Sequence, residues 1–143
     1  MNVATIMAGK DNALITASTS ATLLEIAKTL REHRIGCIVL DDGKGGIAGI
    51  VSERDLVRTI AEHGHDVLGT AVSKCMTKNV ISCQKNDTMD TIMAAMTHGR
   101  FRHMPVVEDG KLIAVISIGD VVKLRIQEAE LEAAAMRDYI ATG

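Results

Sequence analysis

Aromatic side chains are almost absent from this 143-residue sequence, which has no tryptophan, one phenylalanine and one tyrosine. Proteins that hold single-stranded nucleic acid generally stack bases on aromatic rings along a basic groove. Here 16 lysines and arginines face 18 aspartates and glutamates, for a formal net charge of -2. The composition therefore argues against a nucleic-acid partner. Hydrophobic residues still make up 47% of the chain, so the core is expected to be aliphatic.

Long apolar runs and paired cysteines are also missing. No stretch approaches the roughly 20 apolar residues that span a bilayer, and residues 1–9 lack the basic flank and apolar run of a signal peptide. The three cysteines, Cys37, Cys75 and Cys83, are odd in number, and no two have C-x-x-C spacing. We therefore expect reduced thiols in a cytoplasmic protein that has no membrane partner.

Motifs for catalysis or metal binding are lacking too. The pair His63 and His65 has no third ligand of suitable type nearby. The glycine-rich segment 43–46 lacks the Ser or Thr that follows the lysine of a phosphate-binding loop, so it is expected to be a hairpin turn. No nucleophile–base pair or paired catalytic carboxylates can be found. The sequence thus predicts no metal site, no catalytic residue, no catalytic cofactor and no enzymatic activity.

An internal repeat organises what remains. Thr22 matches Thr88 at a separation of 66 residues, as do three further pairs: Ile15 with Ile81, Ile26 with Ile92, and Arg34 with Arg100. After one residue is dropped from the first loop, Ser52 and Asp55 match Ser117 and Asp120 at a separation of 65.

Each copy is predicted to form a β-α-β-β-α unit, because short apolar runs alternate with apolar residues at helical spacing. For the first copy we expect strands over 13–17, 37–40 and 47–51, and helices over 21–33 and from Ser52. For the second we expect strands over 79–83, 104–107 and 112–116, and helices over 88–98 and from Ser117. The predicted organisation is repeat 1 over 1–66, repeat 2 over 67–127 and a helical extension over 128–143. Since neither copy can bury both faces alone, the two should pack into one pseudo-twofold α/β (α+β) module.

The most informative motif is Ser-x-x-Asp, which follows an apolar strand in each copy as Ser52–Asp55 and Ser117–Asp120. A serine N-cap with an acid three residues later is close to a capping box, which stabilises a helix without any further role. A strand-to-helix turn is also an anion site favoured by the helix dipole. The serine could donate to a phosphate, and the carboxylate could accept both hydroxyls of a ribose.

In its two Ser-x-x-Asp motifs and in the stretch from Arg102 to Val107, the chain from about Val3 to Lys123 resembles a CBS-domain pair, or Bateman module. The likeness is to the small stand-alone bacterial type, and to the modules of IMP dehydrogenase and the AMP-activated kinase gamma subunit. It implies a pseudo-twofold pair that binds AMP, ADP or ATP between the copies. Dinucleotides such as NAD, and S-adenosylmethionine, are further candidates.

The resemblance also implies two shared sites, each combining the Ser-x-x-Asp end of one copy with strands of the other. The first would use Ser52, Arg54, Asp55, Val80, Ile81, Arg102 and His103. The second would use Ser117, Gly119, Asp120, Ile15, Gly36 and Cys37. Without aromatic side chains nearby, the adenine would lie between aliphatic groups and be recognised by backbone hydrogen bonds.

The two predicted sites differ in charge. The first gathers Arg54, Arg102 and His103, with His103 a candidate for protonation, and cations strengthen phosphate binding. Gly119, Gly36 and Cys37 hold the corresponding positions in the second. We therefore expect the first site to prefer a compact, highly charged mononucleotide. The second should accept a ligand of more dispersed charge or bind phosphates more weakly.

The C-terminal segment carries a heptad pattern. From Val122 to Ile140 the apolar residues have spacings of 4, 3, 4, 3 and 4: Val122, Ile126, Ala129, Ala133, Met136 and Ile140. Such a helix could pair with a second chain or lie back on its own module. We favour pairing and expect a homodimer.

Two classes of function remain open from the sequence. The first is a regulatory adenine-nucleotide binding module that reports energy or redox state to an unidentified regulated protein. The alternative is an assembly or scaffold protein whose clefts are vestigial.

Overall fold

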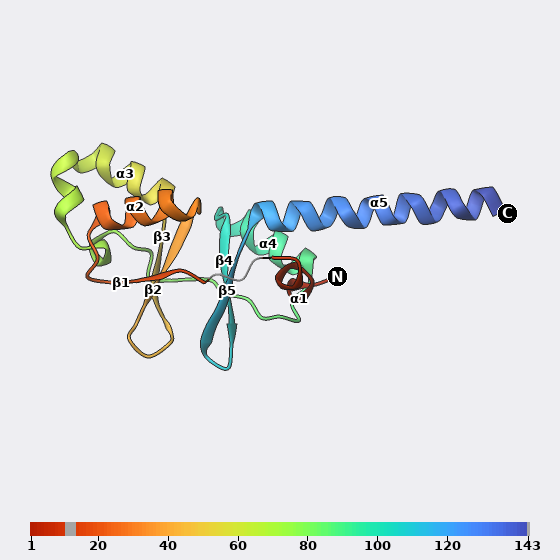
Figure 1. Ribbon diagram of the computed structural model, residues 1–143, viewed down its shortest axis with the longest axis horizontal. Coiled ribbons are helices and arrows are strands. Elements are labelled where there is room, and N and C mark those ends of the chain that lie inside the picture. The colour runs from red at the N-terminus through yellow and green to blue at the C-terminus, as the bar shows by residue number, and fades with distance from the viewer. Residues whose placement is uncertain (11–13, 143) are drawn as a thin grey trace.

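The computed structural model describes residues 1–10 and 14–142 and confirms the mixed α/β fold, with two similar halves and a long C-terminal helix (Figure 1). The first half contains β1 (Thr16–Ser18), α2 (Leu23–His33), β2 (Cys37–Asp41), β3 (Ile47–Ser52) and α3 (Glu53–His63). The second contains α4 (Met89–Gly99), β4 (His103–Glu108), β5 (Lys111–Ser117) and α5 (Ile118–Thr142). A short N-terminal helix, α1 (Val3–Ala8), precedes both. A connector with two 3-10 turns, η1 (His65–Gly69) and η2 (Val72–Lys74), joins them.

The first helix of each half begins and ends in the same way. Thr22 and Thr88 are N-caps whose side chains accept the backbone N–H of Glu25 and Thr91. Such caps satisfy donors that the first helical turn leaves without a partner. Both helices end at an arginine in the left-handed conformation, Arg34 with φ 54° and Arg100 with φ 55°. The repeat seen in the sequence is therefore a repeat of backbone geometry.

The two sheets differ in their first strand. β1 pairs parallel with β2, and β2 pairs antiparallel with β3. In the second half β4 and β5 form the antiparallel pair, and Cys83 makes a single parallel bridge to Val106. The predicted strand over 79–83 is therefore wrong except at Cys83. The strand predicted over 13–17 begins only at Thr16 and runs to Ser18, and residue 13 lies outside the described residues. Ile15, just before β1, and Val80, a few residues before Cys83, each line a cleft and do not belong to a sheet.

The two hydrophobic cores exchange segments. Val3 and Ile6 of α1 are buried in the core of the second half, and Val72 of the connector is buried in the core of the first. Backbone contacts repeat this exchange: Val3 N–H donates to the Asp87 carbonyl, and Leu23 N–H donates to that of Thr70. Each half is thus closed by the segment that precedes the other half, and the two form one packed unit.

The last helix, α5, runs without a break from the end of β5 past residue 128, where the helical extension was predicted to begin. Its outer part extends away from both halves (Figure 1). Its first turns pack on the second core through Val121 and Leu124. Among the described residues, no helix has the length and apolar character needed to cross a membrane.

Gly49 marks the closest approach of the connector to β3. A Cβ at this buried glycine would lie 2.9 Å from the Thr77 carbonyl oxygen and 2.6 Å from Met76 Sδ. Gly49→Ala should therefore lower the free energy of unfolding by about 1–3 kcal/mol, the usual cost of overpacking. Gly69→Ala is the control, because nothing lies within 4 Å of its Cβ position. Urea unfolding that gave equal stabilities for the two variants would contradict this close packing.

Candidate functional site: two clefts between the halves

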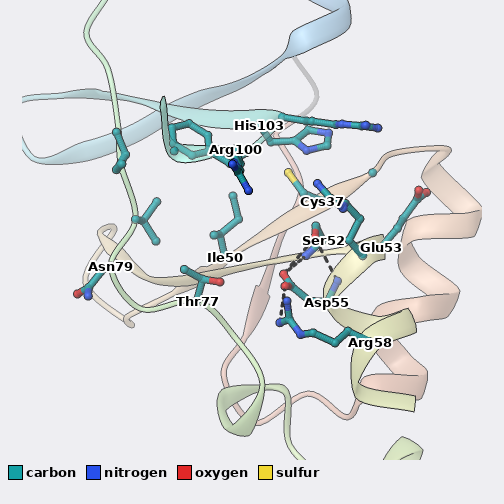
Figure 2. Close-up of a pocket in the computed structure, with 17 residues that line it drawn as sticks. Cys37, Ile50, Ser52, Glu53, Asp55, Arg58, Thr77, Asn79, Arg100 and His103 are labelled. Atoms are coloured by element: carbon teal, nitrogen blue, oxygen red, sulfur yellow. Dashed lines mark hydrogen bonds and ion pairs between the residues drawn. The ribbon is translucent and has the colours of Figure 1, made fainter. Parts of the chain in front are cut away.

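The first cleft, of about 650 Å³, lies between the start of α3 and the second half (Figure 2). All seven residues predicted for the first site line it: Ser52, Arg54, Asp55, Val80, Ile81, Arg102 and His103. The first three come from the β3–α3 turn, and the others come from the connector end, from the loop before β4 and, for His103, from the start of β4. In Figure 2, Arg100 and His103 face Ser52 and Asp55 across the cleft.

A hydrogen-bond network fixes the β3–α3 turn. The Asp55 Oδ2 atom accepts from Ser52 N–H at 2.8 Å and from Ser52 Oγ at 3.1 Å, while Asp55 N–H donates to Ser52 Oγ at 3.3 Å. The other carboxylate oxygen, Oδ1, accepts from Arg58 Nη2 at 2.8 Å. Asp55 is only 9% exposed. Asp55 therefore takes part in the helix cap through Oδ2. Its other carboxylate oxygen, which the cap does not use, forms an ion pair with Arg58.

Two cations of this cleft were missed by sequence reasoning. Arg58 and Arg100 line it together with the predicted Arg54 and Arg102. The i,i+3 spacing of Asp55 and Arg58 is the signal that could have found the first. The repeat pair Arg34–Arg100 could have found the second, because both arginines occupy the same left-handed position and each lines a cleft. A left-handed residue that is not glycine is uncommon and often marks a functional position.

One expectation about the first cleft, that no aromatic side chain lies nearby, is wrong. Phe101 lines the first cleft, so an aromatic ring is available there in addition to the aliphatic side chains of Ile50, Val80 and Ile81. Gly99, two residues before it, lies against this ring, because a Cβ at Gly99 would collide with Phe101. The chain's one phenylalanine therefore lies at a cleft and not in the centre of a core.

The second cleft, of about 700 Å³, is also lined by residues of both halves. Four of its six predicted residues line it: Ile15, Gly36, Cys37 and Ser117. Gly119 and Asp120 are not among the lining residues. Lys10, which does line the cleft, lies against Asp120: its Nζ donates to Asp120 Oδ2 at 2.8 Å and to the Val115 carbonyl at 2.6 Å.

The Lys10–Asp120 pair changes the expected electrostatics of the second cleft. Burial would raise the pKa of Asp120, but the hydrogen bonds and charge of Lys10, with hydrogen bonds from Ser117, outweigh it and hold that pKa below its ordinary range. Lys10 and Arg34 supply positive charge that was not predicted for this site from the sequence. The second cleft remains the less basic one, with two lysine or arginine side chains against four arginines.

His103, Gly36 and Cys37 line both clefts and so form the wall between them. The His103 ring packs on Gly36, where a Cβ would lie 3.0 Å from its Cε1 and Nε2 atoms. Burial, with help from Lys10, lowers the pKa of His103 despite the opposing charges of Glu53 and Asp120. This direction favours the neutral imidazole, and a protonated His103 at a phosphate stays a prediction. Burial also raises the pKa of Cys37 to about 12, which keeps it a thiol.

Comparisons with known proteins point to one family. The CBS-domain sequence profile matches residues 5–62 and 72–126. The crystal structure of a CBS-domain containing protein from Agrobacterium tumefaciens is 46% identical, with a TM-score of 0.85, and the likeness covers 87% of this chain and 99% of that one. A mitochondrial CBS domain-containing protein from Arabidopsis thaliana is 31% identical over 137 residues, which are 93% of this chain and 66% of that protein.

Two further similar structures were solved with ligands. A CBS domain protein from Pyrobaculum aerophilum, complexed with AMP, is 25% identical with a TM-score of 0.74, over 84% of this chain and 89% of that one. A CBS domain pair in complex with 5′-methylthioadenosine and S-adenosyl-L-methionine is 23% identical with a TM-score of 0.79, over 90% of this chain and 98% of that one. All three ligands contain adenine and a ribose with a cis-diol.

The half-buried position of His103 predicts a pH dependence of stability. Because folding lowers its pKa, the unfolded chain binds more protons than the folded chain between the folded pKa and the ordinary value of about 6.5. The free energy of unfolding should therefore fall as the pH falls through this window. In His103→Gln the loss between pH 7.5 and pH 5 should be smaller. Urea unfolding at the two pH values measures it, with His65→Gln as a control at a side chain that is 90% exposed. If His103→Gln lost as much free energy of unfolding between pH 7.5 and pH 5 as the wild type, His103 would not be the source of the pH dependence.

Proposed function

The chain belongs to the CBS-domain family, and from that premise we propose that it is a regulatory module that binds an adenine nucleotide in the clefts between its halves. One observation carries the proposal: four arginines and the Ser52–Asp55 turn surround a single cavity of about 650 Å³. AMP, ADP and ATP combine the groups that such a cavity accommodates: an apolar base, a cis-diol and phosphate. NAD shares these groups and stays a candidate ligand. The bound nucleotide would report energy or redox state to a regulated protein.

In the first cleft, the base is proposed to lie among Val80, Ile81 and Phe101, because these side chains supply its apolar wall. The ribose hydroxyls would be accepted by the Asp55 carboxylate. The phosphate would lie near the start of α3, where the helix dipole favours an anion. The Ser52 hydroxyl would turn away from Asp55 to donate to the phosphate. Arg54, Arg100 and Arg102 would then neutralise its charge through charge-assisted hydrogen bonds.

A carboxylate beside a phosphate would repel it, and the structure contains a feature that offsets this repulsion. Asp55 is paired with Arg58, and Asp120 is paired with Lys10, in both cases at 2.8 Å. A cation at this distance offsets most of the electrostatic repulsion between the carboxylate and a nearby phosphate. We propose that each pair lets the carboxylate keep its acceptors for a ribose without excluding the phosphate.

The two clefts are proposed to differ in affinity. Asp55 lines the first cleft, whereas Asp120 is not among the residues that line the second, so a ribose has a less accessible carboxylate there. Fewer cations also line this cleft. The first cleft is therefore the tighter site for AMP or ATP, and the second is the weaker one. No catalytic step is proposed for either.

The role of Arg102 tests the proposal. Arg102→Ala should weaken AMP binding about tenfold, because a charge-assisted hydrogen bond to phosphate contributes about 1.4 kcal/mol or more. It should barely change adenosine binding, and the loss should shrink at high salt because exposed charges are screened. Calorimetric titration of AMP and adenosine measures both. Arg31→Ala, an exposed arginine of α2 that lines neither cleft, is the matched control.

Three outcomes would contradict parts of this account. Equal losses for AMP and adenosine would show that Arg102 shapes the pocket and does not hold phosphate. Equal losses in Arg102→Ala and Arg31→Ala would place the ligand outside the first cleft. No heat with any adenine compound would favour a scaffold with vestigial clefts.

A further inference from the structure

The outer part of α5 exposes an apolar stripe that its own module does not cover. Val121 and Leu124 turn toward the second core, and Arg125 pairs with Asp90 of α4. Four large apolar side chains of the predicted seam are exposed: Val122 by 45%, Ile126 by 54%, Met136 by 61% and Ile140 by 71%. The helix therefore does not lie back on its module along this face.

The seam, defined as Val122, Ile126, Ala129, Ala133, Met136 and Ile140, keeps heptad spacing over the whole exposed helix. At about 100° per residue it lies roughly a third of a turn from the direction of Val121 and Leu124, which pack on the module. A partner helix on the seam would consequently be clear of the module. In heptad terms Ile126, Ala133 and Ile140 occupy position a, and Val122, Ala129 and Met136 occupy position d.

Charges beside the seam distinguish the possible orientations. In a parallel, in-register pair, each g residue faces the e residue five positions further along the partner. Glu132 would face Arg137 of the other copy, which joins opposite charges. Arg125 would lie near Glu130, although it already pairs with Asp90 and Glu128 of its own chain. In the antiparallel arrangement that keeps the whole seam paired, Glu130 would face Glu130, Glu132 would face Glu132, and Lys123 would face Arg137. All three of those contacts repel.

From this charge pattern and the uncovered seam, we propose that α5 forms a parallel, in-register two-stranded coiled coil with α5 of a second copy of the chain. The seam supplies the contact area and the e and g charges set the orientation. The two modules then project from opposite sides of the coiled coil, with both pairs of clefts open. This dimer does not depend on nucleotide binding, so the two proposals can fail separately.

Two residues of equal exposure test the seam. Met136 is on the seam and 61% exposed, whereas Leu131 lies off it and is 60% exposed. Sedimentation equilibrium of the full chain should show a dimer for the wild type and for Leu131→Asp. Met136→Asp should raise the dimer dissociation constant at least about a hundredfold, because it places a charge in the seam. A wild-type monomer at about 100 μM, or equal masses for both variants, would overturn the proposal.

Charge swaps test the orientation. Glu132→Arg and Arg137→Glu alone should each weaken the dimer about tenfold, since each turns two attractive contacts into repulsive ones. The double variant should recover wild-type affinity, and a mixture of the two single variants should form a heterodimer in preference to either homodimer. Native mass spectrometry separates these species. A dimer that is unchanged in both single variants, or a mixture without heterodimer preference, would exclude the parallel register. Circular dichroism checks that the helix is retained throughout.

Discussion

The exchange of core segments between the halves is the constraint on which the rest of the structure depends. Val3 and Ile6 of α1 complete the second core, and Val72 of the connector completes the first. Burying each such side chain contributes about 1.5–3 kcal/mol, so pulling the halves apart would cost several kcal/mol beyond the direct contact between them. The clefts are therefore bounded by halves that stay together whether or not a ligand is bound.

The same exchange explains why the two clefts are unlike. The segment before β1 continues from α1 and brings Lys10 to Asp120. The segment before Cys83 comes from the connector and crosses β3 at Gly49, where Thr77 exchanges backbone hydrogen bonds with Ile50. In the second cleft the Lys10 side chain donates to the Val115 carbonyl of β5. In the first, the Thr77 backbone N–H donates to the Ile50 carbonyl of β3. Asp55 consequently takes its cation from its own helix, through Arg58.

Much of this arrangement could be predicted from the sequence, for identifiable reasons. Repetition at 66 and 65 residues gave the pairing of Thr22 with Thr88 and of Ser52 with Ser117, and caps are local features that spacing can reveal. All seven residues predicted for the first cleft meet there. Lys10 was missed because its contact with Asp120 spans 110 residues along the chain, which no local pattern encodes. The strand expected over 79–83 failed because an apolar run looks the same whether it faces a sheet or a cleft.

The central claim is that the clefts bind adenine nucleotides, and counting bound nucleotides on the intact chain tests it most directly. Native mass spectrometry during titration with AMP, ATP or NAD should show one nucleotide per chain at low concentration and a second at higher concentration. In Asp55→Asn, which keeps the size of the side chain and the Ser52 cap, the tighter event should be lost while the weaker one remains. Wild-type protein that carries no nucleotide at about 1 mM, or an unchanged occupancy in Asp55→Asn, would contradict the account.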